Sequence, residues 1–485
     1  MASEDPAGQD RREVRRRGRP PRRVRTLTSA TDQPQRRRVA RPLPHRAAAS
    51  LALPAIASNV AVPIAGLVDT AALGHFSTAT DIGAVGLGAA VISTLFWIFS
   101  FLRAGTTSLV GRALGSGDST GAVRHVQRAG ALAAAMSVAW LILMWAVVPA
   151  ILTLLAPEGP ARDAALTYTL IRGLSLPALL VTLIVAGYFI GAKNTRVPLL
   201  VASVQAVANI VLDLVLVGGA GMGAAGAAWG TFGSEWIGAG LAVVILWRRL
   251  EPDQRATMRD WRDATLRRGW GALARFNGAL MGRTALLTSV VTFVASIGSH
   301  FGPEILAANA IMLQLMNVAS YALDGYANAA EALVAHAAGA GDVPGMHAAV
   351  IASAIPMAAI GAVLSLGYWL GRDIILGALT DLPEVREAAI GYWPWIALLP
   401  LVSWGAWWLD GVFLGAGQSG LMFAAMTVSV LGVFLPLLLV GAAVWGLSNG
   451  LVWTAFLVLN AVRQVTLGVA YPRLTRRVSH PAPSI

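Results

Sequence analysis

The sequence predicts an all-α polytopic membrane protein of twelve transmembrane helices, arranged as two pseudo-symmetric lobes of six helices each. Three observations support this fold class. The chain has 485 residues, of which 56% are hydrophobic and only 13% are charged, whereas soluble domains carry about 25% charged residues. Apolar runs long enough to span a bilayer recur about every 30–40 residues. The two halves of the chain also resemble each other in sequence.

The apolar runs place the twelve helices one after another along the chain. We expect them at about 47–74, 82–111, 122–154, 164–191, 197–217, 223–248, 271–299, 304–338, 347–370, 386–416, 420–443 and 448–470. The connecting loops alternate in charge, and those near 75–81, 218–222, 300–303 and 444–448 carry no Lys or Arg. The positive-inside rule then places both termini in the cytoplasm. One lysine against 36 arginines, with abundant Ala and Gly, indicates a GC-rich bacterial genome, so we expect a bacterial cytoplasmic (inner) membrane as the location.

The internal repeat has a nearly constant spacing. The segment LVGRALGSGD at 109–118 matches LVAHAAGAGD at 333–342, and GYFIGA at 187–192 matches GVFLGA at 411–416, both at a shift of 224 residues (333 − 109 and 411 − 187). Because six helices per half is an even number, the halves have the same orientation in the membrane. We expect them to be related by an axis along the membrane normal, with a substrate site between them.

These patterns divide the chain into five segments. They are a disordered Arg-rich cytoplasmic tail (1–46), an N-lobe (47–248), a cytoplasmic linker (249–270), a C-lobe (271–470) and a cytoplasmic C-terminal tail (471–485). The stretch 248–275 is the longest polar interruption of the chain, and we expect an amphipathic segment there. Its tryptophans fit interfacial anchors.

The tail before Ala47 carries fourteen arginines and few apolar residues, which is a disordered composition. Its RREVRRR run suggests a twin-arginine signal, but no hydrophobic stretch follows until residue 47, and that stretch is too long for a signal sequence. Contact with nucleic acid is another interpretation of the charge. We favour contact with anionic lipid headgroups and expect no nucleic-acid partner. A misassigned start codon explains the composition equally well.

The composition also excludes several kinds of chemistry. The chain has no cysteine, which rules out disulfides, thiolate metal sites and cysteine nucleophiles. Its single lysine, Lys193, is followed by Asn194, so no GxxxxGK[ST] phosphate loop is present. We therefore expect no enzyme activity and no cofactor, and any transport would be driven by an ion gradient or by a partner.

The first predicted helix carries a carboxylate, Asp69, within its apolar run. An Asp at the centre of a membrane helix costs about 2.5–3.5 kcal/mol on insertion scales, and such residues are usually functional. Pro63 cannot donate to the carbonyl of Asn59, so we expect a kink that leaves this carbonyl free. The two interpretations of Asp69 are an ion site and a buried acid paired with a neighbouring helix.

Three further polar residues lie in the outer part of the same half. Asn209 and Asp213 are four residues apart on one helix face, and Thr231 lies on the following helix. Each is within about nine residues of the outer end of its helix, which is a similar depth to Asp69 at 1.5 Å per residue. Two carboxylates, an amide and a hydroxyl suit either proton exchange or a hard cation such as sodium.

The repeat helps to decide whether this cluster is an ion site or ordinary packing between helices. The equivalent positions in the second half are Val433, Leu437 and Val294, which are all apolar. A cluster that only joined helices would be expected in both halves. The asymmetry therefore favours a dedicated ion site in the first half, with an ordinary interhelical hydrogen-bond cluster as the alternative.

The second half carries its own charged residues inside predicted helices: Arg283, Asp324, Glu331 and Asp410. Asp324 and Glu331 are seven residues apart and lie close to the same helix face. They either pair with Arg283 for structural reasons or line a central cavity and attract cationic substrates. Arg103, in the first half, is expected to pair with an acid or a carbonyl.

Several motifs together resemble the multidrug and toxic compound extrusion (MATE) family, and within it the branch of DNA-damage-inducible protein F (DinF). They cover about residues 47–470 and read GLVDTAALGHF at 66–76, ANIVLDLVLV at 208–217, FNGALMGRTALL at 276–287, YALDGYANAAEALVAHAAGAGD at 321–342 and WWLDGVFLGAG at 407–417. The Arg-rich tail departs from the family pattern.

This resemblance implies a function and a site. Members of the family have two six-helix lobes and export amphipathic, often cationic compounds against proton or sodium influx. The resemblance assigns a cation site to Asp69, Asn209, Asp213 and Thr231, which match the family's pattern residue by residue. No other metal site is expected. The leading hypothesis is a monomeric antiporter in the lipid bilayer that exports small organic substrates. The alternatives are a flippase for lipid-linked precursors and a non-transporting membrane scaffold.

Overall fold

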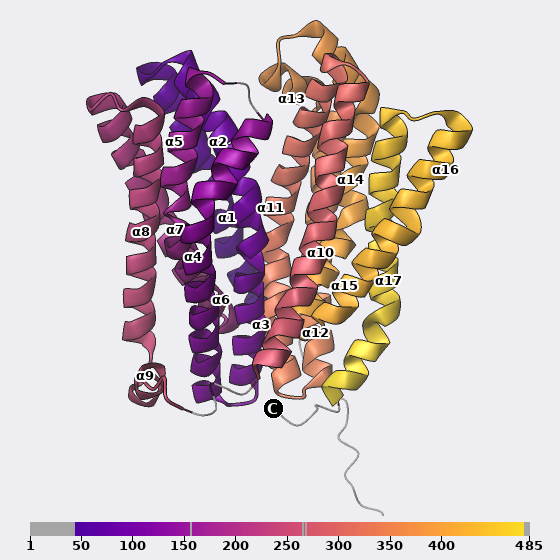
Figure 1. The fold of residues 1–485 in the computed structure, drawn as a ribbon. Coiled ribbons are helices and arrows are strands. Elements are labelled where there is room, and N and C mark those ends of the chain that lie inside the picture. Colours follow the sequence, from indigo (N-terminus) through magenta and orange to yellow (C-terminus); the bar gives the residue numbers. More distant parts are fainter. Residues whose placement is uncertain (1–43, 156–157, 264–265, 267–268, 480–485) are drawn as a thin grey trace, which may run out of the picture. The chain divides into compact units, whose positions relative to one another are not determined.

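The computed structural model describes residues 44–155, 158–263, 266 and 269–479, except for the side chains of residues 60–72, 74, 79 and 272. The predicted disordered tail therefore falls almost entirely outside the described residues. The described part is helical, and the helices of the two halves form two bundles (Figure 1).

The first half contains eight α-helices, one 3-10 turn and one π-helical segment. They are α1 (His45–Phe76), α2 (Ala79–Trp97), η1 (Ile98–Ser100), α3 (Phe101–Gly115), α4 (Ser119–Leu155), α5 (Pro160–Gly173), α6 (Leu176–Gly191), α7 (Arg196–Asp213), η2 (Leu214–Gly219) and α8 (Gly223–Arg249). The short helix α9 (Pro252–Arg259) follows in the linker and packs against α4, where Gln127 Nε2 donates to the carbonyl of Thr257 over 2.8 Å.

The second half repeats this arrangement. Its elements are α10 (Trp270–Ile297), η4 (Gly298–His300), α11 (Pro303–Gly339), α12 (Val343–Leu370), α13 (Arg372–Leu379), α14 (Pro383–Gly415), α15 (Ser419–Ser429), η5 (Val430–Phe434), α16 (Leu435–Trp445) and α17 (Asn449–Ser479). Helix α9 and the C-terminal end of α17 lie at the same end of the described unit (Figure 1).

Among the described residues, ten helical segments are long and apolar enough to cross a membrane, and the pair α5 and α6, bent by 44°, would make an eleventh span. These eleven correspond to the second to twelfth predicted helices. The first predicted helix corresponds to α1, which includes undescribed side chains. The structure therefore supports a polytopic helical membrane protein, while the count of twelve spans stays a prediction.

The repeated GSGD and GAGD motifs end one helix and begin the next in both halves. Gly117 and Gly341 have φ values of 82° and 64°, which glycine adopts without steric penalty. The following aspartates cap the next helices: Asp118 Oδ1 accepts the amide of Gly121 over 2.7 Å, and Asp342 Oδ1 accepts that of Gly345 over 3.0 Å. The repeat seen in the sequence thus specifies the same turn twice.

Glycines also set the distance between helices within each half. A Cβ on Gly187 of α6 would lie 2.7 Å from the carbonyl oxygen of Arg103 on α3. At the equivalent place, a Cβ on Gly411 of α14 would overlap the carbonyl oxygen of Ala327 on α11. Small residues permit this close approach of membrane helices. The same helix pair is therefore packed in the same way in the two lobes.

Replacing Gly411 by Ala should destabilise the C-lobe, because the new methyl group would collide with backbone that cannot rotate away. We expect a loss of about 1–3 kcal/mol, as for other overpacked cores. Gly391→Ala is the matched control on the same helix, since a Cβ there has no neighbour within 4 Å. The measurement is thermal unfolding of both purified variants. Equal melting temperatures for the two variants would contradict the packing described here.

Candidate functional site

The predicted N-lobe pair is formed in the structure. Asn209 Nδ2 donates to Asp213 Oδ2 over 2.6 Å, and both side chains are buried, with Asp213 fully excluded from solvent. Helix α7 ends at Asp213, and the π-helical segment η2 begins at the next residue. Such π-bulges occur frequently at functional sites. The spacing of four residues therefore produces the contact that the sequence predicts.

Packing of α8 against α7 brings Thr231 into the same region. The carboxylate of Asp213 lies over Gly230, where a Cβ would overlap Oδ1. Thr231 is the next residue along α8, is half-buried, and donates its hydroxyl to the carbonyl of Ala227 over 3.0 Å. A glycine at position 230 thus makes room for the buried acid beside the predicted hydroxyl.

Asp69 lies on α1, but its side chain is outside the described residues. The predicted kink at Pro63 falls in the same stretch. Helix α1 packs against α7 and α8, which carry the other three predicted ligands. The participation of Asp69 stays a prediction.

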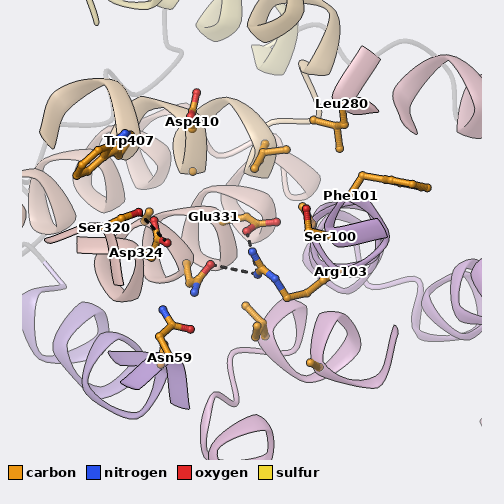
Figure 2. Close-up of a pocket in the computed structure, with 18 of the residues that line it drawn as sticks. Asn59, Ser100, Phe101, Arg103, Leu280, Ser320, Asp324, Glu331, Trp407 and Asp410 are labelled. Carbon is orange, nitrogen blue, oxygen red and sulfur yellow. Dashed lines mark hydrogen bonds and ion pairs between the residues drawn. The ribbon is translucent and has the colours of Figure 1, made fainter. Parts of the chain in front are cut away.

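A separate polar cavity of about 310 Å³ lies between the two halves (Figure 2). It is lined by residues of α1, α2, η1, α3, α6, α7, α10, α11 and α14, including Trp97, Phe101 and Trp407. All four charged C-lobe residues named from the sequence reach it: Arg283, Asp324, Glu331 and Asp410. Asn209, Asp213 and Thr231 do not line it, so the described ion-site residues and the cavity are distinct.

Asp410 is held between two arginines. Arg283 Nη2 contacts Asp410 Oδ2, and Arg463 Nη2 donates to the same oxygen over 3.0 Å. Arg463 comes from α17, is almost completely buried, and is not among the residues expected from the sequence. An arginine inside the apolar run 448–470 is the signal that points to it.

Glu331 pairs with the opposite half rather than with Arg283. Arg103 Nη1 lies 3.8 Å from Glu331 Oε2 and donates to Asn328 Oδ1 over 3.1 Å. Figure 2 shows the guanidinium of Arg103 reaching toward Glu331 across the cavity. The expectation that Arg103 has an acidic partner is met. The sequence suggests that Arg283 pairs with Asp324 or Glu331. In the structure Arg283 contacts Asp410 instead.

Of the three acids that line the cavity, Asp324 has the weakest described contacts with hydrogen-bond donors and positive charges. Among the described residues its hydrogen bond is a long one, 3.5 Å from Ser320 Oγ, and no arginine lies within ion-pair distance. It lies near Asn59 of α1 and on the Trp407 side of Glu331 (Figure 2). The cavity thus offers one acid without a salt bridge beside aromatic walls. The described residues contain no group of three or more His, Asp or Glu side chains that could hold a metal ion.

The fold and the cavity define a membrane protein in which a polar chamber lies between two repeated helix bundles, as in secondary transporters. A family model described as MatE matches the chain at residues 54–215 and 280–440. The chain therefore belongs to the MatE family. The two matched stretches follow the two halves of the repeat.

Several known proteins are similar to this chain. The DNA damage-inducible protein F of Escherichia coli K12 is 32% identical over 423 residues, which are 87% of this chain and 91% of that protein. Protein DETOXIFICATION 44, chloroplastic, of Arabidopsis thaliana is 28% identical over 86% of this chain and 80% of its own length. A probable multidrug resistance protein NorM of Thermotoga maritima is 29% identical over 41% of this chain and 44% of its own length.

Solved structures have the same fold at lower identity. A MOP superfamily transporter from Pyrococcus furiosus aligns with a TM-score of 0.80 and 17% identity over 90% of this chain and 97% of that one. A MATE transporter of Vibrio cholerae aligns with a TM-score of 0.78 and 18% identity over 89% of this chain and 97% of that one. The protein is thus a multi-pass membrane transporter rather than an enzyme.

Asp410→Asn should destabilise the protein strongly, because it leaves two buried arginines without their shared carboxylate. Breaking a buried ion pair costs about 3–5 kcal/mol. Asp324→Asn should change stability by less than about 1 kcal/mol, since no described arginine lies within ion-pair distance of this carboxylate. Thermal unfolding of both variants checks this. Adding Arg463→Met to Asp410→Asn should recover part of the loss, and a more severe loss from Asp324→Asn would contradict the assignment of partners.

Proposed function

We propose that this protein is a secondary active antiporter that exports amphipathic, cationic small organic compounds in exchange for an inward-moving cation. The observation that carries the proposal is the buried Asn209–Asp213 pair, which lies in one half only and apart from the central cavity. Its equivalents in the other half, Val433 and Leu437, are apolar. A buried acid in a membrane helix is usually functional, and exchange of a cation is a function that needs its charge. No other buried acid in the described part of the N-lobe has an apolar residue at the equivalent position of the other half.

The cavity supports cationic cargo. Its described charged lining consists of three acids and two arginines, and each arginine already contacts an acid. Asp324 then remains to attract a positive charge, and Trp97, Phe101 and Trp407 offer aromatic faces for a cation or an apolar ring. A flippase for lipid-linked pyrophosphates would need a cationic cavity with free arginines. The family membership disfavours the scaffold alternative.

Alternating access is supported by a barrier of packed helices between the halves. Helices α3 and α11 meet where a Cβ on Gly111 would lie 2.7 Å from that of Ala335. Ser108 Oγ donates to the carbonyl of Leu414 over 2.6 Å, and the ring of His336 contacts the carbonyl of Gly191 over 2.7 Å. These contacts separate the central cavity from the end of the unit that carries α9. In our proposal they break when the cavity opens to that side.

We place that end in the cytoplasm of a bacterial cell, with both termini cytoplasmic and the protein acting as a monomer. The linker, the C-terminus and the turn at Lys193 carry basic residues, in keeping with the positive-inside rule. The proposed ion ligands are Asp69, Asn209, Asp213 and Thr231. We favour a proton as the coupling ion, because two carboxylates with neutral neighbours readily share one proton.

Asp69→Asn and Asp213→Asn should each keep the fold and abolish coupled transport. Asparagine is nearly isosteric with aspartate, but it cannot exchange a proton and weakens a cation site by a full charge. The double variant should be little worse than either single variant, because residues that act as a unit are not additive. The assay is dye efflux normalised to folded protein in the membrane. Normal efflux from a well-expressed Asp69→Asn protein would remove this acid from the mechanism.

Efflux from inverted vesicles under separately imposed gradients tests the coupling itself. We expect transport with a proton gradient and no added effect of a sodium gradient. Sodium binding can be tested on its own by thermal unfolding at constant pH and ionic strength. A saturable rise in melting temperature with sodium but not with potassium would indicate that the coupling ion is sodium rather than a proton. Efflux that depends on neither gradient would overturn the antiport mechanism.

A further inference from the structure

A second cavity lies beyond the barrier, where α3 and α11 end and α15 begins. Its volume is about 1050 Å³, more than that of the central cavity. Residues of both halves line it: α3, the following turn and α4 from the first half, and α10, α11, α15 and α17 from the second. The proposed transport mechanism uses none of its side chains.

This cavity is strongly basic. Four arginines and a histidine from four helices converge on it: Arg112, His125, Arg128, Arg275 and Arg477. Among its described lining residues the sole acid is Asp118. That carboxylate caps α4, because Oδ1 accepts the amide of Gly121 over 2.7 Å and the hydroxyl of Thr120 over 3.1 Å. Asp118 keeps its negative charge in these contacts, but a single carboxylate offsets only one of the four arginine charges.

Three of the arginines have neutral partners in the part of the chain that the structure describes. Arg112 Nε donates to the carbonyl of Ser108 over 3.3 Å, and Arg275 Nε donates to that of Gly271 over 3.3 Å. Arg477 Nη1 donates to Gln418 Oε1. A guanidinium has five donors, so each of the three keeps most of them available. Like charges gathered in one cavity repel each other, and a bound anion would remove that repulsion.

The positive-inside rule explains why basic residues occur at this end, but not why they converge from both halves on one cavity. Arginine forks match the oxygens of a phosphate group better than those of other anions. One side of the cavity is apolar, with Leu109, Leu273 and Phe276. The volume is also larger than a single small anion requires. These features fit a phosphate group attached to an apolar body.

We propose that this cavity binds a phosphate ester, with the phosphate held by Arg112, Arg275 and Arg477 and the apolar part against Leu109, Leu273 and Phe276. Arg112 belongs to α3 of the first half, whereas Arg275 and Arg477 belong to α10 and α17 of the second. A ligand held by all three joins the two halves. Because it binds the conformation in which α3 and α11 meet, it favours that conformation over the one open to this side. The phosphate comes from a lipid headgroup or from a soluble ester.

Binding to the purified full-length protein tests the site without reference to transport. The probes are dihexanoyl phosphatidic acid, which carries chains, and glycerol 3-phosphate, which carries the same phosphate without them. Both are titrated as potassium salts at constant ionic strength, so that sodium plays no part. We expect saturable binding of at least one probe. Binding of the phosphatidic acid alone identifies a lipid source, and equal binding of both identifies a soluble ester.

The double variant Arg275→Gln with Arg477→Gln should weaken binding about 100-fold, since each charge-assisted contact is worth roughly a factor of ten. The matched control is Arg473→Gln with Arg476→Gln, which removes the same charge from exposed positions of α17 outside the cavity. It should bind within about twofold of the unmodified protein. Absence of saturable binding by both probes, or equal losses in the two double variants, would overturn the site.

The bridging role has its own readout. The chain has no cysteine, so a fluorophore pair can be placed at Ser116→Cys and Ser479→Cys, one in each half near this cavity. We expect the bound probe to increase the fraction of molecules in which the two fluorophores are close together. An unchanged distance distribution at saturating ligand would overturn the stabilisation of this conformation.

Discussion

Close backbone contact at glycines determines how this transporter is assembled. In each half one helix rests directly on the backbone of another, at Gly187 over Arg103 and at Gly411 over Ala327. The halves then meet in the same manner, because Cβ atoms on Gly115 and Gly339 would overlap the carbonyl oxygens of His336 and Arg112. Lipid supplies no hydrophobic force between helices, so packing of this kind stabilises the assembly. Larger side chains at these places would separate both the helices and the halves.

The two halves use this common scaffold for different charges. The first half buries Asp213 with an amide neighbour, away from the central cavity. The second half buries Asp410 between two arginines and directs Asp324 into the cavity. The repeat therefore provides one architecture in which the two halves bury different charged groups.

The barrier between the halves separates two cavities of opposite character. Three acids line the central cavity, while arginines dominate the cavity beyond Gly115 and Gly339. Packing between α3, α6, α11 and α14 makes this separation. In the alternating-access mechanism proposed above, ligands on either side would act on the same equilibrium between conformations.

The sequence alone determined the membrane class, the twofold repeat and the contact of Asn209 with Asp213, because hydropathy, repeat spacing and helical periodicity are local properties. The capping turns at Asp118 and Asp342 follow from the repeated motif for the same reason. Tertiary structure decided which charges meet: Arg283 with Asp410, Arg103 with Glu331, and the unexpected Arg463. Those pairs join residues 53 to 228 positions apart (463 − 410 and 331 − 103), and no local pattern specifies which of several buried acids an arginine reaches. The convergence of arginines from four helices on one cavity likewise exists only once the halves are packed together.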